Sequence, residues 1–141
     1  MRAVVARGLD GRCEVAGKQV SGFLGEGLVA LLGVTHGDGE DQAQKMARKL
    51  AELKLLRGER NALEATAPVM LISQFTLYAD TAKGRKPSWS KAAPGPVAEP
   101  LVERVAELLE DRGLVVARGE FGADMQITFT NDGPVTLVID T

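Results

Sequence analysis

Apolar and polar residues alternate along this chain with two different periods, which together predict a mixed α/β fold. Period-two alternation and one continuous apolar run indicate strands, several of them separated by glycine turns. The expected strands are residues 4–5, 14–16, 19–24, 28–34, 69–75, 114–117, 126–130 and 135–139. The first four of these strands are expected to form an N-terminal meander.

Apolar residues at spacings of three and four predict two amphipathic helices that pack on the sheet. The first covers 41–57, with Asp38 as its candidate cap and Gly58 just past its end. The second covers 97–112, where Pro100 limits how early the helix can begin, because proline is tolerated only in a first turn. The apolar faces are defined by Met46, Leu50, Leu53 and Leu56, and by Leu101, Val105, Leu108 and Leu109.

Length and composition fit one domain. The chain has 141 residues, of which 45% are hydrophobic, and no repeat or linker, so we expect a single domain over 1–141. The expected fold class is α/β, with an antiparallel or mixed sheet, or a partial barrel, carrying the two helices. No apolar run approaches the ~18 residues of a membrane span or a secretory signal, so we expect a cytoplasmic protein without a membrane partner. Because the formal net charge is −2, contact with nucleic acid requires a local basic cluster.

The inventory of reactive side chains narrows the chemistry. One cysteine, Cys13, and one histidine, His36, are too few for a structural zinc site, and neither lies beside a candidate site. We therefore expect no metal, no cofactor and no thiol nucleophile. The sequence around His36 is typical of an exposed turn. A strand follows Gly22, Gly25 and Gly27 where a phosphate-binding helix should begin, which favours a β-turn.

Polar groups gather where the predicted strand before Ser73 ends. Ser73, Gln74 and Thr76 are polar. Because Phe75 and Leu77 continue the apolar alternation, the hydroxyls and the amide are expected at the mouth of an apolar wall. The backbone N–H groups of Phe75 and Thr76, with the Thr76 hydroxyl, would donate to the oxyanion of an ester. A structural alternative is that Ser73 and Thr76 cap groups of the strand.

A second unusual segment, Asn-Asp-Gly-Pro-Val-Thr, covers residues 131–136. An Asp-Gly pair between two β-like runs is common in hairpin turns, and Pro134 suits the start of an edge strand. A functional interpretation rests on the backbone, since Gly133 lacks a Cβ and Pro134 lacks an N–H. Such a bare, rigid corner would approach a substrate α-carbon closely and refuse a side chain on one face, which is a steric test of handedness. The residues alone leave both interpretations open.

The two segments resemble the signature motifs of the D-aminoacyl-tRNA deacylase family. Residues 73–77 resemble its SQxxL motif, and residues 131–136 resemble its NxGPxT motif. Residues 25–34, 85–91 and 121–126 are also similar to the family, so the resemblance covers nearly the whole chain. It implies a deacylase-type fold and hydrolysis of the ester that joins a D-amino acid, or glycine mischarged on tRNA(Ala), to tRNA.

The resemblance also implies roles for individual residues. The catalytic set is Ser73, Gln74, Phe75 and Thr76, the substrate-binding set is Met125, Asn131, Lys86 and Trp89, and the chiral-selection set is Gly133, Pro134 and Arg7. The protein is expected to be a homodimer in which a cis Gly133-Pro134 pair of one subunit enters the pocket of the other and excludes L-amino acids. Either the Thr76 hydroxyl attacks the ester, or a water activated by the 2′-hydroxyl of the terminal adenosine does. With no histidine in the motifs, we favour the water, with protein amides as the oxyanion partners.

The chain departs from the family pattern at two places outside the motifs. The segment 57–68 is shorter than the family's usual hairpin, and Trp89 replaces the usual phenylalanine. Trp89 either stacks on a base or anchors its loop on the core. The long loop 80–96 carries four cations that either steer phosphates or form ordinary solvated surface. These cations are Lys83, Arg85, Lys86 and Lys91.

Two other functions remain open at this point. One is the sister class of deacylases, in which the Gly-Pro bond is trans and the pocket accepts L-alanine on a mismatched tRNA; Arg7 argues against it. The other is a non-catalytic nucleic-acid-binding module on the same scaffold.

Overall fold

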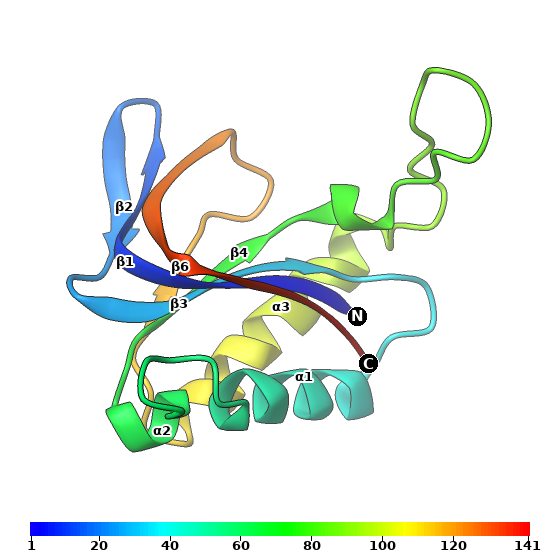
Figure 1. Ribbon diagram of the computed structural model, residues 1–141. Coiled ribbons are helices and arrows are strands. Elements are labelled where there is room, and N and C mark those ends of the chain that lie inside the picture. The colour runs from blue at the N-terminus through cyan, green and yellow to red at the C-terminus, as the bar shows by residue number, and fades with distance from the viewer.

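The computed structural model describes residues 1–141 as one strongly curved sheet with helices packed beneath it (Figure 1). The strands are β1 (Arg2–Val15), β2 (Lys18–Gly22), β3 (Glu26–Gly33), β4 (Val69–Ser73), β5 (Val116–Arg118) and β6 (Met125–Asp140). The helices are α1 (Glu40–Glu52), α2 (Ala62–Ala65) and α3 (Gly95–Glu110), with a 3-10 turn, η1 (Phe75–Tyr78). The strand order is β2-β1-β3-β4-β5, and β6 also pairs with β1. The predicted α/β class, with a sheet curled toward a barrel, is confirmed.

β1 is one long strand that pairs with three others. Residues 2–9 pair with β3, residues 12–15 pair with β2, and β6 follows the strand along most of its length. The prediction of two short strands here is wrong, because the strand continues through a register shift between Leu9 and Arg12, where Asp10 has φ +53°. A Cβ on Gly11 would lie 2.4 Å from the Phe23 ring, so only glycine lets the strand close onto this ring. The prediction of a four-strand N-terminal meander is also wrong: there are three strands, and β1 lies between β2 and β3, which do not pair with each other.

The parallel strands β3, β4 and β5 form the half of the sheet on which the helices pack. α1 lies between β3 and β4 in the chain, and α3 lies between β4 and β5, as parallel pairing requires. Both helices cover the same face of the sheet and contact each other (Figure 1). The main core of 24 buried residues lies between the helices and the sheet and includes Leu32, Met46, Leu71 and Val105. This packing fixes where the carboxyl ends of β3 and β4 emerge.

α1 is shorter than predicted at its C-terminal end. It ends at Glu52 rather than at residue 57, because Leu53 adopts extended backbone with ψ 132°. Its N-cap is Gly39, whereas Asp38 has other partners. The Asp38 carboxylate accepts hydrogen bonds from the N-terminal ammonium and from the Thr35 N–H, each at 2.8 Å. Asp38 therefore holds the chain terminus against the β3–α1 turn instead of capping the helix.

α3 begins earlier than predicted, at Gly95, so that Pro100 lies inside it. The proline removes one backbone hydrogen bond, to the carbonyl four residues earlier. The helix persists because Val105 and Leu109 are completely buried against the core. The short segment 57–68 contains α2 rather than a strand hairpin. No helix in the structure has both the length and the apolar character needed to cross a membrane.

A smaller apolar cluster packs on the other side of the sheet and includes Cys13, Phe23, Val29 and Met70. Burial raises the pKa of the Cys13 thiol, which keeps it protonated. Cys13 is therefore a core residue, in agreement with its exclusion as a nucleophile. Ile72 belongs to the same cluster, one residue before the end of β4.

Candidate active site

A pocket of about 540 Å³ opens at the carboxyl ends of β3 and β4, beside the first turn of α3. Its lining is mostly apolar, with a few polar groups, as is usual for small-molecule sites. The lining includes Ser73, Gln74, Phe75, Trp89, Phe121 and Met125. Five of these six were predicted as site residues from the sequence.

Residues 73–77 are positioned by the end of the parallel ladder. Ser73 pairs with Leu32 of β3, and the Gln74 N–H donates to the Leu32 carbonyl at 2.8 Å. The chain then leaves the sheet as η1. Because a Cβ on Gly33 would lie 3.0 Å from the Gln74 carbonyl oxygen, a larger residue there would push η1 away from β3. Gly33 thus allows η1 to pack directly against the end of β3.

The start of η1 presents two free donors. The N–H groups of Phe75 and Thr76 come first in the turn, have no acceptor within it, and donate to no other backbone oxygen. The amide of Gln74 donates to Thr76 Oγ1. Since this hydroxyl accepts from a side chain, and Ser73 caps no backbone group, the interpretation as strand capping is wrong. Thr76 itself lies just outside the pocket lining.

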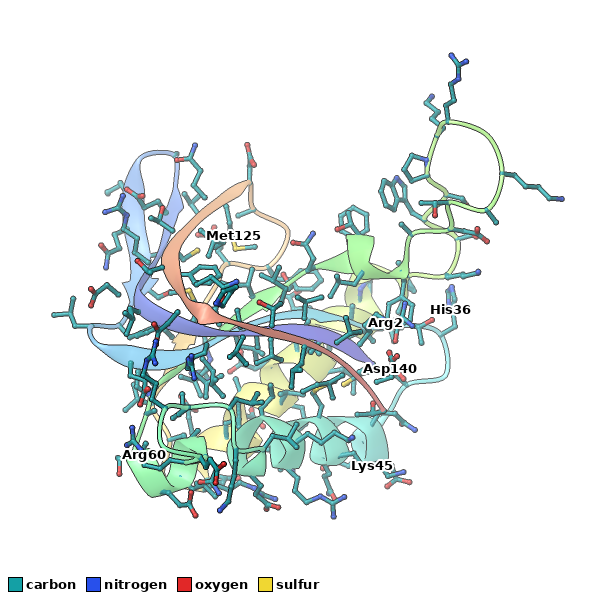
Figure 2. All side chains as sticks on the ribbon, in the orientation of Figure 1. Arg2, His36, Lys45, Arg60, Met125 and Asp140 are labelled. Atoms are coloured by element: carbon teal, nitrogen blue, oxygen red, sulfur yellow. The ribbon has the colours of Figure 1, made fainter.

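Aromatic side chains form a contact across the mouth of the pocket. The rings of Phe75 and Trp89 meet edge to face, with centroids 5.4 Å apart and planes at 75°. Trp89 therefore anchors its loop on η1, although 44% of its surface is still exposed. Met125, labelled in Figure 2, lies at the start of β6. Its Sδ accepts a hydrogen bond from the Glu120 N–H, and the side chain lines the pocket.

The loop from Asp80 to the start of α3 projects from the body and is tied down at its base (Figure 1). Thr35 Oγ1 donates to the Lys91 carbonyl at 2.5 Å, and the His36 ring lies 2.9 Å from the Ser90 carbonyl (Figure 2). His36 is exposed in a turn, as predicted, and has no contact with the pocket. Lys91 pairs with Asp80 at 3.0 Å. The other three loop cations, Lys83, Arg85 and Lys86, are exposed and form no ion pair within the chain.

The segment 131–136 is a bulge within one strand. β6 continues through it, so the predictions of two strands, 126–130 and 135–139, and of a hairpin turn are wrong. Gly8 pairs with Asn131 and Ala6 with Thr136, which leaves four residues of β6 opposite Arg7 alone. The Asn131 side-chain amide donates to Thr136 Oγ1 at 2.9 Å and closes the bulge. The two outer residues of this motif therefore have a structural role.

Two arginines hold the inside of this bulge. Arg7 Nε donates to the Asp132 carbonyl at 3.0 Å. Arg57 Nε and Nη2 donate to the two carboxylate oxygens of Asp132, each at 2.8 Å, and this hydrogen bonding lowers the Asp132 pKa. Gly133 has φ +101°, and a Cβ there would lie 2.3 Å from Arg7 Nη2. The family resemblance pointed to Arg7 but not to Arg57, and no local pattern connects Arg57 to a residue 75 positions away.

The peptide bond between Gly133 and Pro134 is trans, as are all others in the chain. The cis geometry implied by the resemblance is therefore not what this structure contains. Here the chain turns through the positive φ of Gly133 and the four-residue bulge, so the corner forms without a cis bond.

The two motifs do not share a pocket within one chain. The pocket lining contains no residue from 131–136, and Asn131 and Pro134 are exposed on β6 instead. Arg7 lies with the corner, whereas Lys86 lies on the exposed part of the loop. The structure thus groups the predicted site residues into a pocket, a loop and a separate corner.

Comparisons with known proteins cover the chain as a whole. A family model described as D-Tyr-tRNA(Tyr) deacylase matches residues 4–140. A D-aminoacyl-tRNA deacylase of Kineococcus radiotolerans is 56% identical over 140 residues, which are 99% of each chain. A solved structure titled c-Myc DNA Unwinding Element Binding Protein has a TM-score of 0.91, 32% identity, and coverage of 100% of this chain and 99% of the other. A probable eukaryotic D-amino acid tRNA deacylase, at 16% identity, TM-score 0.83 and coverage of 99% and 98%, shows the same fold.

Proposed function

Because this chain belongs to the D-Tyr-tRNA(Tyr) deacylase family, we propose that it hydrolyses the ester bond of D-aminoacyl-tRNA and releases a free D-amino acid and tRNA. The observation that carries the proposal is the pair of free N–H groups of Phe75 and Thr76 at the mouth of an apolar pocket. An ester carbonyl that enters this pocket would find two donors where its oxygen becomes negatively charged.

The reaction needs little from the protein beyond positioning. Water attacks the carbonyl carbon, the oxyanion accepts from the two N–H groups, and the ribose oxygen leaves with a proton as the tetrahedral intermediate collapses. Gln74 occupies one lone pair of Thr76 Oγ1, which leaves the Thr76 hydroxyl proton free to donate toward the ester or the water. We favour activation of the water by the 2′-hydroxyl of the terminal adenosine, since neither motif contains a histidine. The one carboxylate in the motifs, Asp132, is bound by Arg57 and lies outside the pocket lining.

We assign the rest of the tRNA end to the aromatic mouth and the loop. Phe75 and Trp89 are partly exposed, and their faces suit a base such as the terminal adenine. The cations Lys83, Arg85 and Lys86 lack carboxylate partners, so phosphates can approach them without breaking an ion pair. With tRNA as its substrate, the protein is assigned to the cytoplasm.

The corner at Gly133-Pro134 is assigned to chiral selection in a homodimer. Because it lies outside the pocket of its own chain, it would act in the pocket of a second subunit. Leu137 and Val138 continue the same strand and are 38% and 65% exposed, which suits burial at an interface. A backbone corner that blocks one face of the α-carbon rejects an L-side chain but accepts hydrogen, so glycyl-tRNA, including glycine mischarged on tRNA(Ala), should also be a substrate.

Two observations favour other candidates enough to require a test. The trans Gly133-Pro134 bond is the geometry of the sister class that accepts L-alanyl-tRNA. The solved structure at 32% identity is titled c-Myc DNA Unwinding Element Binding Protein, which keeps a nucleic-acid-binding module as the other candidate.

One assay separates the three candidates. Purified protein is incubated with D-tyrosyl-, L-tyrosyl-, glycyl- and L-alanyl-tRNA, with a proven deacylase as the positive control. We expect hydrolysis of the D-tyrosyl and glycyl esters only. Preference for L-alanyl-tRNA would assign the chain to the sister class, and failure to release any amino acid would favour the binding module.

A further inference from the structure

We propose that Arg57 is a positioning residue for chiral selection, because its guanidinium fixes Asp132 and through it the backbone of the Gly133-Pro134 corner. The inference rests on the proposed role of this corner. It assigns a function to the shortened segment 57–68, to which the motifs assign none.

The contact between Arg57 and Asp132 is a two-point fork. Nε lies 2.8 Å from Oδ2 and Nη2 lies 2.8 Å from Oδ1, the parallel arrangement that only arginine provides. The Asp132 carboxylate is only 13% exposed, although the Arg57 side chain is 60% exposed. Two fixed distances restrain both the position and the rotation of the carboxylate, whereas one contact would leave the rotation free.

Arg7 holds the same residue from the other side. Arg7 binds the backbone carbonyl of Asp132, which is the peptide group that leads into Gly133. An ideal Cβ on Gly133 would lie 2.3 Å from Nη2 of Arg7 and 3.7 Å from Nη2 of Arg57, so both guanidinium groups border the corner. Arg7 Nε also lies 3.3 Å from Asp132 Oδ2, so Arg7 restrains the backbone and one carboxylate oxygen. Arg57 donates to both carboxylate oxygens and fixes the rotation of the side chain.

The Arg57 backbone is itself anchored to the sheet. Its N–H donates to Glu26 Oε2 at 3.1 Å, and its carbonyl accepts from Arg60 Nε at 2.9 Å. Arg60, labelled in Figure 2, in turn donates from Nη2 to Glu26 Oε1 at 2.7 Å, which links the turn to the start of β3. Exposed ion pairs usually contribute little because ordering long side chains costs entropy. Here the backbone at one end and the carboxylate at the other are already fixed, so that cost is reduced.

The test compares the ratio of kcat/KM for D-tyrosyl-tRNA to that for L-tyrosyl-tRNA in Arg57→Ala, Arg57→Lys and Arg12→Ala. We expect the ratio to fall roughly three- to tenfold in Arg57→Ala and less in Arg57→Lys, which keeps the charge but not the fork. Arg12 is the matched control, since its side chain is 53% exposed and pairs with Glu14 away from the corner. An Arg12→Ala variant that loses as much selectivity as Arg57→Ala would overturn the inference.

A second measurement isolates the path through Asp132. If Arg57 acts only through this carboxylate, Arg57→Ala should cause no further loss of selectivity in an Asp132→Asn background; additive losses would overturn the inference. Amide hydrogen exchange of the peptide 131–136 should also be faster in Arg57→Ala, and unchanged exchange would contradict the positioning role. If Gly133→Ala alters the ratio and Arg57→Ala does not, this inference fails while the role of the corner stands. If neither variant alters the ratio, both this inference and the proposed role of the corner fail.

Discussion

The ring of Phe75 contacts the ring of Trp89 edge to face, at a centroid distance of 5.4 Å, and this pair joins the pocket to the long loop. Such a pair contributes roughly 0.5–1.5 kcal/mol beyond its buried area. We expect Trp89→Ala to raise KM for D-aminoacyl-tRNA about two- to tenfold with little change in kcat, because the aromatic mouth loses a wall and the loop its anchor. Trp89→Phe, which restores a ring, should remain near wild type. Steady-state kinetics of the two variants checks this, and equal KM values for Trp89→Ala and Trp89→Phe would contradict it.

Removal of the Thr76 hydroxyl should reduce the chemical step. By analogy with the loss of one oxyanion donor, Thr76→Ala should lower kcat about a hundredfold, while KM changes little. Thr76→Ser keeps the acceptor for Gln74 and a proton to donate, so it should retain most of the activity. Single-turnover hydrolysis at saturating enzyme measures this step. Full activity in Thr76→Ala would assign stabilisation of the oxyanion to the two N–H groups alone.

The loop cations should act on the whole tRNA and not on the ester. We expect a triple variant with glutamine at Lys83, Arg85 and Lys86 to bind tRNA more weakly. The slope of log kcat/KM against log salt concentration should become shallower by about two, since each phosphate contact contributes roughly 0.7–0.9 to that slope. Hydrolysis of D-aminoacyl-adenosine should not change. The control is glutamine at Lys45, Arg48 and Lys49, three cations of α1 remote from the pocket lining. An equal effect of both triple variants would show only a loss of overall charge.

A side chain at residue 133 should cost both stability and selectivity. Gly133→Ala places a Cβ at φ +101° and 2.3 Å from Arg7 Nη2, so the residue is strained and Arg7 must move. Strain of this kind costs about 1–3 kcal/mol, which thermal unfolding would measure. Gly17→Ala is the matched control, because Gly17 has φ +77° but nothing within 4 Å of its Cβ position. Only Gly133→Ala should alter the preference for D- over L-tyrosyl-tRNA.

Tyr78, the last residue of η1, provides a direct spectroscopic test of the fold around the site. Burial, with smaller contributions from Asp38 and Asp140, raises its pKa to about 12. Because the folded pKa exceeds the unfolded value of about 10, this contribution to stability is complete below pH 10 and is lost as the pH rises toward 12. Since Tyr78 is the only tyrosine, phenolate absorbance reports it alone. A midpoint near 10 in the folded protein would contradict the packing of η1, and Tyr78→Phe should flatten the alkaline loss of stability.

The sequence predicted those parts of the site that depend on contiguous residues. Ser73, Gln74 and Phe75 follow a buried strand, and the polarity change after Ile72 locates the pocket mouth correctly. The alternation also located every strand, but it divided β1 and β6, which continue through register shifts in their pairing.

Long-range contacts account for what the sequence could not provide. Nothing local indicates that Arg57 reaches Asp132, because that pairing depends on how the shortened segment 57–68 folds against β3. In the same way, aspartate is a common helix-capping residue, yet the carboxylate of Asp38 accepts hydrogen bonds from the N-terminal ammonium and the Thr35 N–H. The residue type predicts the commonest partner, whereas the fold brings to Asp38 the ammonium of Met1, because the start of β1 pairs with the end of β3.

The way in which the long loop is fastened has an evolutionary consequence. Thr35 and His36 bind the loop through the main-chain carbonyls of Lys91 and Ser90, which every amino acid possesses. Replacement of the side chains at these two positions therefore leaves the attachment chemistry intact. Residues 90 and 91 can therefore change in evolution without loss of these two hydrogen bonds, whereas the aromatic contact of Trp89 depends on its side chain.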